Sequence, residues 1–195
     1  MATPLDFARQ QIDESARIHG LLRPLAPTLT ALAEQMAGRF RAGGRAYFFG
    51  NGGSAADAQH WAAELSGRFY IDRPALPAFA LTTNASQLTA IANDYGYDET
   101  FARPVRGMVT DGDTVIGIST SGRSRNVVRA LAAAREKGAL TVGFTGEDEG
   151  DMAAVCDVLI QIPSADTPRI QEGHALCGHV LCALVERLVF ASDAR

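Results

Sequence analysis

The spacing of apolar residues along the chain changes in character near residue 44. Before this point apolar side chains recur every three or four residues, which is typical of two amphipathic helices over about residues 4–43. Gly43 and Gly44 follow directly and predict the end of the second helix. Beyond them, short apolar runs alternate with longer helical patterns.

Five of these short runs have the length of buried parallel strands. They are AYFF (46–49), PAFAL (77–81), TVIGIS (114–119), LTVGFT (140–145) and DVLIQI (157–162). Helical patterns cover Ser54–Leu65, Ser86–Tyr95, Asp98–Met108 and Asn126–Lys137, with a short one near Met152. The alternation predicts an α/β fold with a doubly wound five-stranded parallel sheet in the flavodoxin-like order.

A last helical pattern ends the chain. We expect Thr167 to be its N-cap and Pro168 its first helical residue, because proline fits the first turn of a helix. The length of 195 residues, with 47% hydrophobic and 21% charged residues, fits one folded domain. We therefore expect a single domain over residues 1–195, with N-terminal helices (1–44), an α/β core (45–165) and a C-terminal helix (166–192).

Charge and cysteine content narrow the class of protein. The net charge is −4 and the arginines are scattered, so no basic surface for nucleic acid is expected. Three cysteines without a CxxC pair are typical of a reducing compartment. No signal peptide and no uncharged apolar stretch of about 18 residues is visible. We expect a cytoplasmic protein that does not span a membrane.

Hydroxyl groups are concentrated in the loop IGISTSGRSRNVV, which runs from a predicted strand into a helix. Ser119, Thr120, Ser121 and Ser124 can converge on one anion there, together with the free N–H groups of the helix N-terminus. The alternative is that Ser121 or Ser124 only caps the helix. Four hydroxyls within six residues favour a phosphate site.

The loop FFGNGGSAADAQH also joins a strand to a helix, but it is not a nucleotide-binding motif. The dinucleotide fingerprint GxGxxG would need glycine where the chain has Ala55, and no lysine follows the glycines as in a Walker loop. No nucleotide cofactor is expected.

His60 and Glu64 follow in this helix at positions i and i+4, so both side chains share one face. This spacing suits a metal site or an ordinary polar pair. Gln171 and His179 interrupt the apolar terminal helix and lie on one side of it, about two turns apart. The alternative is that His179 is a buried histidine whose hydrogen bonds are made within the core. The pair His60 and Glu64, taken together with Gln171 and His179, favours a functional site.

These segments together resemble the sugar isomerase (SIS) domain family, and within it the phosphoheptose isomerases. The matching pieces are GNGGSAADAQHWAAELSGR (50–68), LTTNASQLTAIANDYGYDETFARPV (81–105), GISTSGRSRNVVRALAAAREKGA (117–139) and TPRIQEGHALCGHVLCALVE (167–186). With the leading helices, the resemblance covers almost the whole chain and implies a single SIS domain.

The resemblance implies a role for each matching residue. Glu64 matches the proposed catalytic base and His179 the proposed acid. The zinc ligands match His60, Glu64, Gln171 and His179. The substrate contacts match Asn51, Gly52, Gly53, Glu64, Asn93, Asp94, Ser119, Thr120, Ser121, Ser124 and Gln171. The family pattern further implies one zinc ion per subunit and a homotetramer with active sites at subunit interfaces.

The implied reaction converts sedoheptulose 7-phosphate to D-glycero-D-manno-heptose 7-phosphate through an enediol, the first step of heptose precursor synthesis. A rival reading is a non-catalytic SIS protein that binds a sugar phosphate or a replication-initiator partner, but such relatives lack the acid and base that Glu64 and His179 provide. A metal-dependent hydrolase would need a more complete ligand set.

Four residues depart from the expected pattern. Arg123 and Arg125 stand in the hydroxyl loop where small or amide residues are frequent, and Arg123 has the reach to contact a phosphate or a neighbouring subunit. Gly173 and Gly178 lie inside the terminal helix, where each costs about 1 kcal/mol relative to alanine unless close packing requires it.

Overall fold

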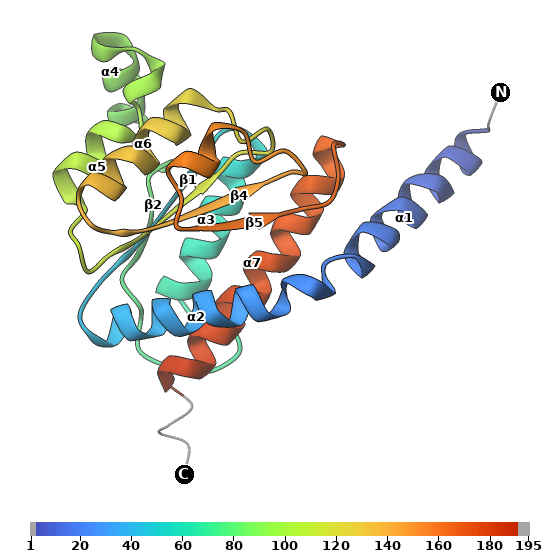
Figure 1. The fold of residues 1–195 in the computed structure, drawn as a ribbon, viewed down its shortest axis with the longest axis horizontal. Coiled ribbons are helices and arrows are strands. Elements are labelled where there is room, and N and C mark those ends of the chain that lie inside the picture. Colours follow the sequence, from blue (N-terminus) through green and yellow to red (C-terminus); the bar gives the residue numbers. More distant parts are fainter. Residues whose placement is uncertain (1–2, 191–195) are drawn as a thin grey trace.

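The computed structural model describes residues 3–190 and shows a parallel sheet covered by helices on both faces (Figure 1). The strands are β1 (Ala46–Gly50), β2 (Ala78–Ala80), β3 (Thr114–Ile118), β4 (Leu140–Thr145) and β5 (Val158–Gln161). They lie in the order β2-β1-β3-β4-β5, and every neighbouring pair is parallel. The predicted α/β class and flavodoxin-like order are confirmed.

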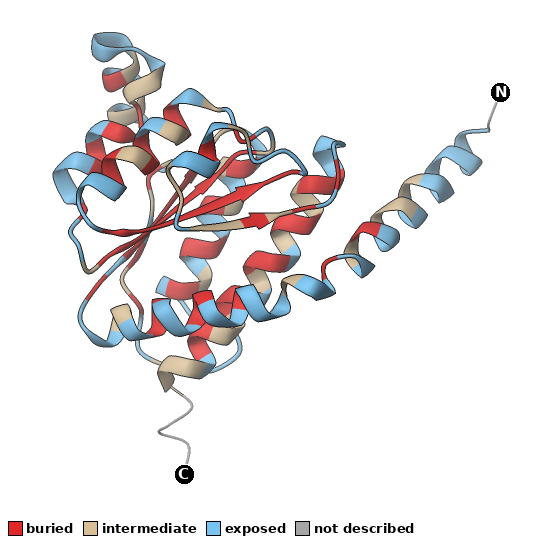
Figure 2. Cartoon of the chain, in the orientation of Figure 1, coloured by how far each residue is buried: buried red, intermediate tan, exposed pale blue. Residues whose placement is uncertain are grey.

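Two hydrophobic layers lie on opposite faces of the sheet, because successive strand residues point to opposite sides. Phe48 packs in the layer formed with α2 (Ala26–Arg41), α3 (Gly53–Ser66) and α7 (Thr167–Phe190). Phe49 packs in the layer formed with α5 (Ala102–Met108) and α6 (Arg125–Glu136). The central strands are buried on both faces, as Figure 2 shows.

The N-terminal segment forms the two helices that the apolar spacing predicts. They are α1 (Pro4–Gly20) and α2, joined by the short 3-10 turn η1 (Arg23–Leu25). Gly43 adopts a φ of +88°, which ends the second helix as expected. The N-terminal half of α1 extends away from the body of the molecule (Figure 1), and its side chains are largely exposed (Figure 2).

The prediction of one helix over Asp98–Met108 is wrong. The segment forms a 3-10 turn, η2 (Tyr97–Glu99), followed by α5, while α4 (Ala85–Tyr95) precedes it close to the predicted bounds. Pro104 explains the break, because its ring would clash with the carbonyl of Thr100 in a continuous helix. Proline is tolerated only in the first turn, so α5 begins just before it. The short pattern near Met152 is a 3-10 turn, η3 (Gly150–Ala154).

The terminal helix α7 begins one residue earlier than predicted. Thr167 is its first helical residue, and the carbonyl of Asp166 accepts the first helical hydrogen bond from Ile170 N–H at 2.9 Å. Residues 191–192 of the predicted C-terminal helix lie outside the described residues. By length and hydropathy alone, α7 is a candidate membrane span, but it packs against α2 and α3 as a core helix.

Close packing accounts for both glycines of α7. A Cβ atom on Gly178 would overlap the indole ring of Trp61 in α3. A Cβ atom on Gly173 would lie 2.7 Å from Cγ2 of Ile162. The two glycines therefore let α7 lie directly against α3 and the segment after β5.

Candidate active site

The order of the strands reverses between β1 and β3, since α3 and α6 follow them on opposite faces of the sheet. The carboxyl ends of these strands thus open a crevice, which is where ligands of such sheets bind. A pocket of about 320 Å³ lies there. Its lining residues are Asn51, Gly52, Gly53, Ser54, Ile118, Ser119, Thr120, Ser124, Thr167 and Gln171.

The hydroxyls predicted to bind phosphate lie together in this crevice. Ser119 is buried, and its Oγ donates to Ser124 Oγ at 2.9 Å and lies 3.4 Å from Ser121 Oγ. Ser121 and Thr120 also line an adjoining pocket of about 270 Å³ with Arg123. The structure therefore brings the four predicted hydroxyl residues to one place.

Ser124 occupies the N-cap position of α6, yet within the described residues its side chain makes no capping hydrogen bond. The N–H of Val127 is bound by the Asn126 side chain, but the first two N–H groups of α6 and the positive end of its dipole are left for a ligand. The Ser124 hydroxyl accepts from Ser119 and does not cap α6, so the alternative interpretation does not hold for this serine. Arg123 pairs with Asp148 at 2.6 Å beside the hydroxyls, and Arg125 pairs with Asp98 at 2.8 Å.

The glycine turn brings the start of α3 against α7. Gly52 has a φ of +57° and occupies the N-cap of α3, a backbone conformation that favours glycine. A Cβ atom on Gly53 would overlap the side-chain amide of Gln171. Gly53 therefore permits the close approach that places Gln171 in the pocket.

Asn51 is fixed by residues that the sequence did not single out. Its Oδ1 accepts from Tyr97 Oη and from Asn126 Nδ2, each at 2.9 Å. Asn126 is 2% exposed and also reaches Thr100 Oγ1 at 3.3 Å. A signal existed for Asn126, since it is a polar residue on the inner face of the helix that follows the hydroxyl loop.

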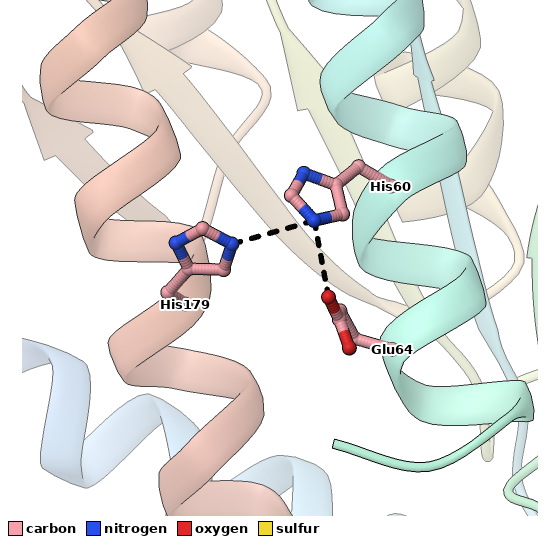
Figure 3. A group of neighbouring side chains, drawn as sticks. All are labelled: His60, Glu64 and His179. Carbon is pink, nitrogen blue, oxygen red and sulfur yellow. Dashed lines mark hydrogen bonds and ion pairs between the residues drawn. The ribbon is translucent and has the colours of Figure 1, made fainter. Parts of the chain in front are cut away.

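His60, Glu64 and His179 form a second cluster between α3 and α7 (Figure 3). His60 Nε2 lies 3.0 Å from Glu64 Oε1 and 3.4 Å from His179 Nε2. All three donor atoms lie within 4.8 Å of one another. Residues more than 100 positions apart in the chain are thus brought together.

The donors in this cluster fit a zinc ion. Two imidazole nitrogens and one carboxylate oxygen are the protein ligands of many catalytic zinc sites. Zinc–ligand bonds of about 2.0–2.2 Å place tetrahedral donors roughly 3.4 Å apart, close to the two separations above. The third pair of donors, on Glu64 and His179, lies within 4.8 Å, so all three side chains face one small space between the two helices.

Three predicted site residues lie away from this cluster. Gln171 contacts Gly53, eight residues before His179 in α7 and so about 12 Å from it along the helix axis. Asn93 and Asp94 are exposed on α4, where Asn93 Nδ2 donates to Asp94 Oδ1 at 2.9 Å. Neither lines the pocket between β1 and β3 as the described residues form it.

Asp57 is a further ionisable group of α3 that the sequence did not single out. It lies one turn before His60, and partial burial raises its pKa to about 6, an effect that the charge of His60 opposes. Its Oδ2 is buried and has no hydrogen-bond partner within residues 3–190. The spacing Gly53, Asp57, His60, Glu64 places it on the same stripe of the helix.

Comparison with known proteins identifies the family of the chain. The family model described as SIS domain matches residues 13–146. A phosphoheptose isomerase of Burkholderia pseudomallei (strain K96243) is 47% identical over 192 residues, covering 97% of this chain and 98% of the relative. One from Geobacter sulfurreducens is 51% identical over 173 residues, covering 89% and 92%.

A solved structure of a phosphoheptose isomerase from Neisseria gonorrhoeae matches with a TM-score of 0.89 at 41% identity, covering 94% of this chain and 99% of that one. Fold and sequence thus match over nearly the full length of both chains. The chain belongs to the phosphoheptose isomerase family of SIS-domain proteins.

Proposed function

We propose that this protein isomerises sedoheptulose 7-phosphate to D-glycero-D-manno-heptose 7-phosphate, the first step of heptose precursor synthesis. The observation that carries the proposal is the meeting of Glu64 and His179 beside a crevice lined with hydroxyls. The names of the relatives support the same substrate class, since they are phosphoheptose isomerases at 47–52% identity. A non-catalytic SIS protein is not favoured.

The reaction moves one proton between C1 and C2 through an enediol. Glu64 removes the C1 proton of the ketose while His179 protonates the carbonyl oxygen at C2, which gives the neutral enediol. Glu64 then returns the proton to C2, and His179 accepts the proton of the C1 hydroxyl, which leaves the aldehyde. Base and acid end the cycle in their starting states.

The hydroxyl loop binds the end of the substrate that does not react. Ser119, Thr120, Ser121 and Ser124 would donate to the phosphate together with the first N–H groups of α6. Binding energy from this remote group orients the sugar and lowers the entropic part of the barrier. Asn51, Gly52 and Gly53, with Asn93, Asp94 and Gln171, are the proposed contacts to the sugar.

His60, Glu64 and His179 would hold one zinc ion per chain. Gln171, the proposed fourth ligand, lies against Gly53 here and would have to turn its amide along α7 toward His179 to reach that ion. When bound, zinc would polarise the oxygens of the substrate. A zinc-bound carboxylate is a weaker base, and Glu64 Oε1 is the oxygen that faces His60. We therefore assign the proton transfer to the other oxygen, Oε2. The same argument applies to His179, whose Nε2 faces His60, so its other nitrogen, Nδ1, would exchange the proton with the substrate oxygens.

The direct test is to incubate the purified, zinc-replete protein with sedoheptulose 7-phosphate and follow the sugar by NMR. We expect an aldoheptose 7-phosphate, with deuterium entering at the reacting carbons in D₂O through the enediol. Binding of the ketose without turnover would instead identify a non-catalytic SIS protein.

Glu64→Gln tests the base. We expect kcat to fall by about 100-fold or more, the range for loss of a general base, with the fold unchanged. Glu34→Gln, an exposed glutamate in α2, is the matched control and should keep full activity. Full activity of Glu64→Gln would remove Glu64 from the proton transfer.

Removal of the metal tests the proposed zinc site. Elemental analysis should find about one zinc ion per chain, and His60→Ala should abolish its binding because one of three clustered donors is lost. A chelated protein that keeps full activity would exclude zinc from the mechanism.

The proposal includes a cytoplasmic homotetramer whose active sites lie at subunit interfaces. Exposed apolar side chains support the assembly. Leu176 and Val180 flank His179 on the outer face of α7, while Leu5, Phe7 and Ile12 are exposed on α1.

A further inference from the structure

A buried ion pair holds the turn that follows α3. Arg73 Nε lies 3.0 Å from Oε1 of Glu186 in α7, and both side chains are only 2% exposed. The carboxylate of Glu186 also accepts backbone N–H groups from Phe69, Tyr70 and Ile71, at 3.0, 2.7 and 3.2 Å. One carboxylate therefore fixes three successive residues of the turn.

Arg73 fixes the other side of the turn, the end of α3. Its guanidinium donates to the carbonyls of Glu64, Leu65 and Gly67, at 2.8, 2.6 and 2.9 Å. The last carbonyls of a helix have no intrahelical donors, and a cation there is favoured by the helix dipole. Arg73 thus holds the backbone of the turn that bears Glu64.

Phe69 extends this arrangement to the proposed acid. Its ring stacks on the imidazole of His179, with the ring centroids 5.7 Å apart and the planes inclined by 11°. The backbone N–H of Phe69 is bound to Glu186. Glu186 therefore fixes the residue whose ring lies against His179. The ion pair consequently acts on Glu64 from one side and on His179 from the other.

Stability alone is a weak reason for such a pair. Two charges taken out of water lose solvation energy that their attraction often fails to return, and apolar residues of similar volume are frequently as stable. Burial raises the pKa of Glu186, but the three N–H groups and Arg73 bring it below its ordinary value, so the carboxylate stays ionised. What this pair provides and an apolar pair cannot is a set of directed hydrogen bonds.

We propose that Arg73 and Glu186 are positioning residues for the isomerisation, holding Phe69 against His179 and the last turn of α3 beneath Glu64. The inference rests on the proposed function, in which Glu64 and His179 transfer the proton. Misplacement of these groups by a fraction of an ångström should slow the chemical step and leave the remote phosphate contacts intact.

Arg73→Lys and Glu186→Gln test the pair. Lysine keeps the charge but cannot reach the carboxylate and three carbonyls at once. We expect kcat per folded molecule to fall about tenfold or more, because positioning acts on the chemical step, while KM stays within about twofold of wild type. A purely structural pair would lower the melting temperature and leave kcat unchanged.

Asp113→Asn is the matched control. Asp113 is also 2% exposed and also accepts backbone N–H groups, but its side-chain partners within the described residues are Arg45 and Thr110, which lie before β1 and β3 and not in α3, α7 or the turn after α3. Its replacement should lower stability and keep kcat per folded molecule. An equal loss of kcat in this control would overturn the inference.

A readout that needs no turnover separates this inference from the proposed function. The chain has four histidines, so the imidazole signal of His179 can be assigned by NMR in the metal-free protein. We expect the His179 signal to shift in Glu186→Gln. It should also shift in Phe69→Leu, a variant that leaves the ion pair intact and should fold even if Arg73→Lys and Glu186→Gln do not. An unchanged His179 signal in Phe69→Leu, or wild-type kcat in the folded pair variants, would contradict the inference. A wild-type protein without isomerase activity would contradict only the proposed function.

Discussion

Gly178 of α7 sets how closely two helices of the candidate site approach. The ring of Trp61 lies against it and is fully buried, so it has no space to turn away from an added methyl group. Alanine gains about 1 kcal/mol of helix propensity, but overpacking of a close core contact typically costs about 1–3 kcal/mol. The steric cost should exceed the gain in helix propensity, because the buried Trp61 ring cannot move aside. His179 and His60 are neighbours of Gly178 and Trp61 on the same two helices, so the displacement should reach them as well.

We predict that Gly178→Ala lowers the free energy of unfolding by about 1–2 kcal/mol and weakens zinc binding. Urea denaturation and metal competition measure the two effects. Gly38→Ala in α2 is the control, since within the described residues no atom beyond its chain neighbours and the backbone of its own helix lies within 4 Å of the position of its Cβ. It should stabilise the protein by about 0.5–1 kcal/mol, and equal behaviour of the two variants would refute the packing argument.

His174 is the buried histidine of α7 and gives the protein a sensitivity to acid. Its Nε2 donates to the carbonyl of Thr145 at 3.0 Å, while Nδ1 is buried without a partner in residues 3–190. Burial lowers its pKa to about 4, against the opposing effect of the Thr145 hydrogen bond. In the unfolded chain a histidine has a pKa of about 6.5.

Between these two values the unfolded chain binds more protons than the folded one, so stability is full above about pH 6.5 and falls as the pH drops toward 4. We predict a falling melting temperature across this window. His174→Gln can still donate to Thr145 and does not titrate, so its melting temperature should depend less on pH. Thermal melts at several pH values from 7.5 to about 4.5 would show equal slopes if His174 were not responsible.

At the scale of elements, the N-terminus of α6 is the proposed phosphate site. Ser124 bonds to Ser119 and does not cap the helix. Its removal should therefore affect the ligand more than the fold. We predict that Ser124→Ala raises KM for the sugar phosphate about tenfold, the effect of losing one hydrogen bond to a charged group, and changes the unfolding free energy by less than about 0.5 kcal/mol.

Asn84→Ala provides the comparison for stability. The Asn84 side chain does cap its helix, accepting from Gln87 N–H at 3.0 Å, so its loss should destabilise by about 1 kcal/mol. If Ser124→Ala behaved like Asn84→Ala and kept its KM, the serine would be a cap and the proposed phosphate site would fail.

The elements differ in how well the sequence predicts them. All five strands lie within two residues of their predicted ends, because a strand buried on both faces is a continuous apolar run. The apolar pattern over residues 98–108 predicts one continuous helix, because the spacing of apolar residues does not show that Pro104 excludes the preceding turn from the helix. The hydroxyl and glycine loops are predictable as one site, since β1 and β3 end at the same edge of the sheet.

Other parts of the site leave no local signal in the sequence. Arg73 and Glu186 are 113 residues apart, one in the segment between α3 and β2 and the other inside α7, and nothing in the sequence near either residue indicates that they pair. Asn51 depends on Tyr97, which belongs to a 3-10 turn whose direction only the fold determines. Residues that act through long-range contacts become visible only when the helices are packed.

At the scale of the whole molecule, α1 is a helix that the rest of the chain leaves largely exposed. Its contact with the body begins near the middle, where Arg169 Nη1 donates to the carbonyl of Gln11 at 2.8 Å. Leu5 and Phe7 in its outer half are 59% exposed, and Ile12, next to Gln11, is 69% exposed. Such side chains are typical of a surface that another subunit covers.

We predict that Ile12→Glu reduces the mass measured by light scattering, from that of the proposed tetramer to that of a smaller species, with an unchanged circular dichroism spectrum. The side chain is exposed in the single chain, so the charge should act on assembly and not on folding. Gln10→Glu adds the same charge on the same helix at an exposed polar position and should remain a tetramer. An unaltered mass for Ile12→Glu would exclude this half of α1 from the interface.

The parallel course of α3 and α7 also has a consequence for substrate length. Gly53 meets Gln171 at the hydroxyl pocket, and His60 meets His179 seven residues further along α3, about 10 Å away. Both helices are fixed to each other by Gly178 and Trp61, so this spacing is rigid. In the proposed site, a sugar phosphate should be processed only if its carbon chain reaches from the hydroxyl pocket to Glu64 and His179. We expect three-carbon sugar phosphates to be too short to do so, which would make chain length, and not only the pattern of hydroxyls, a basis for selection.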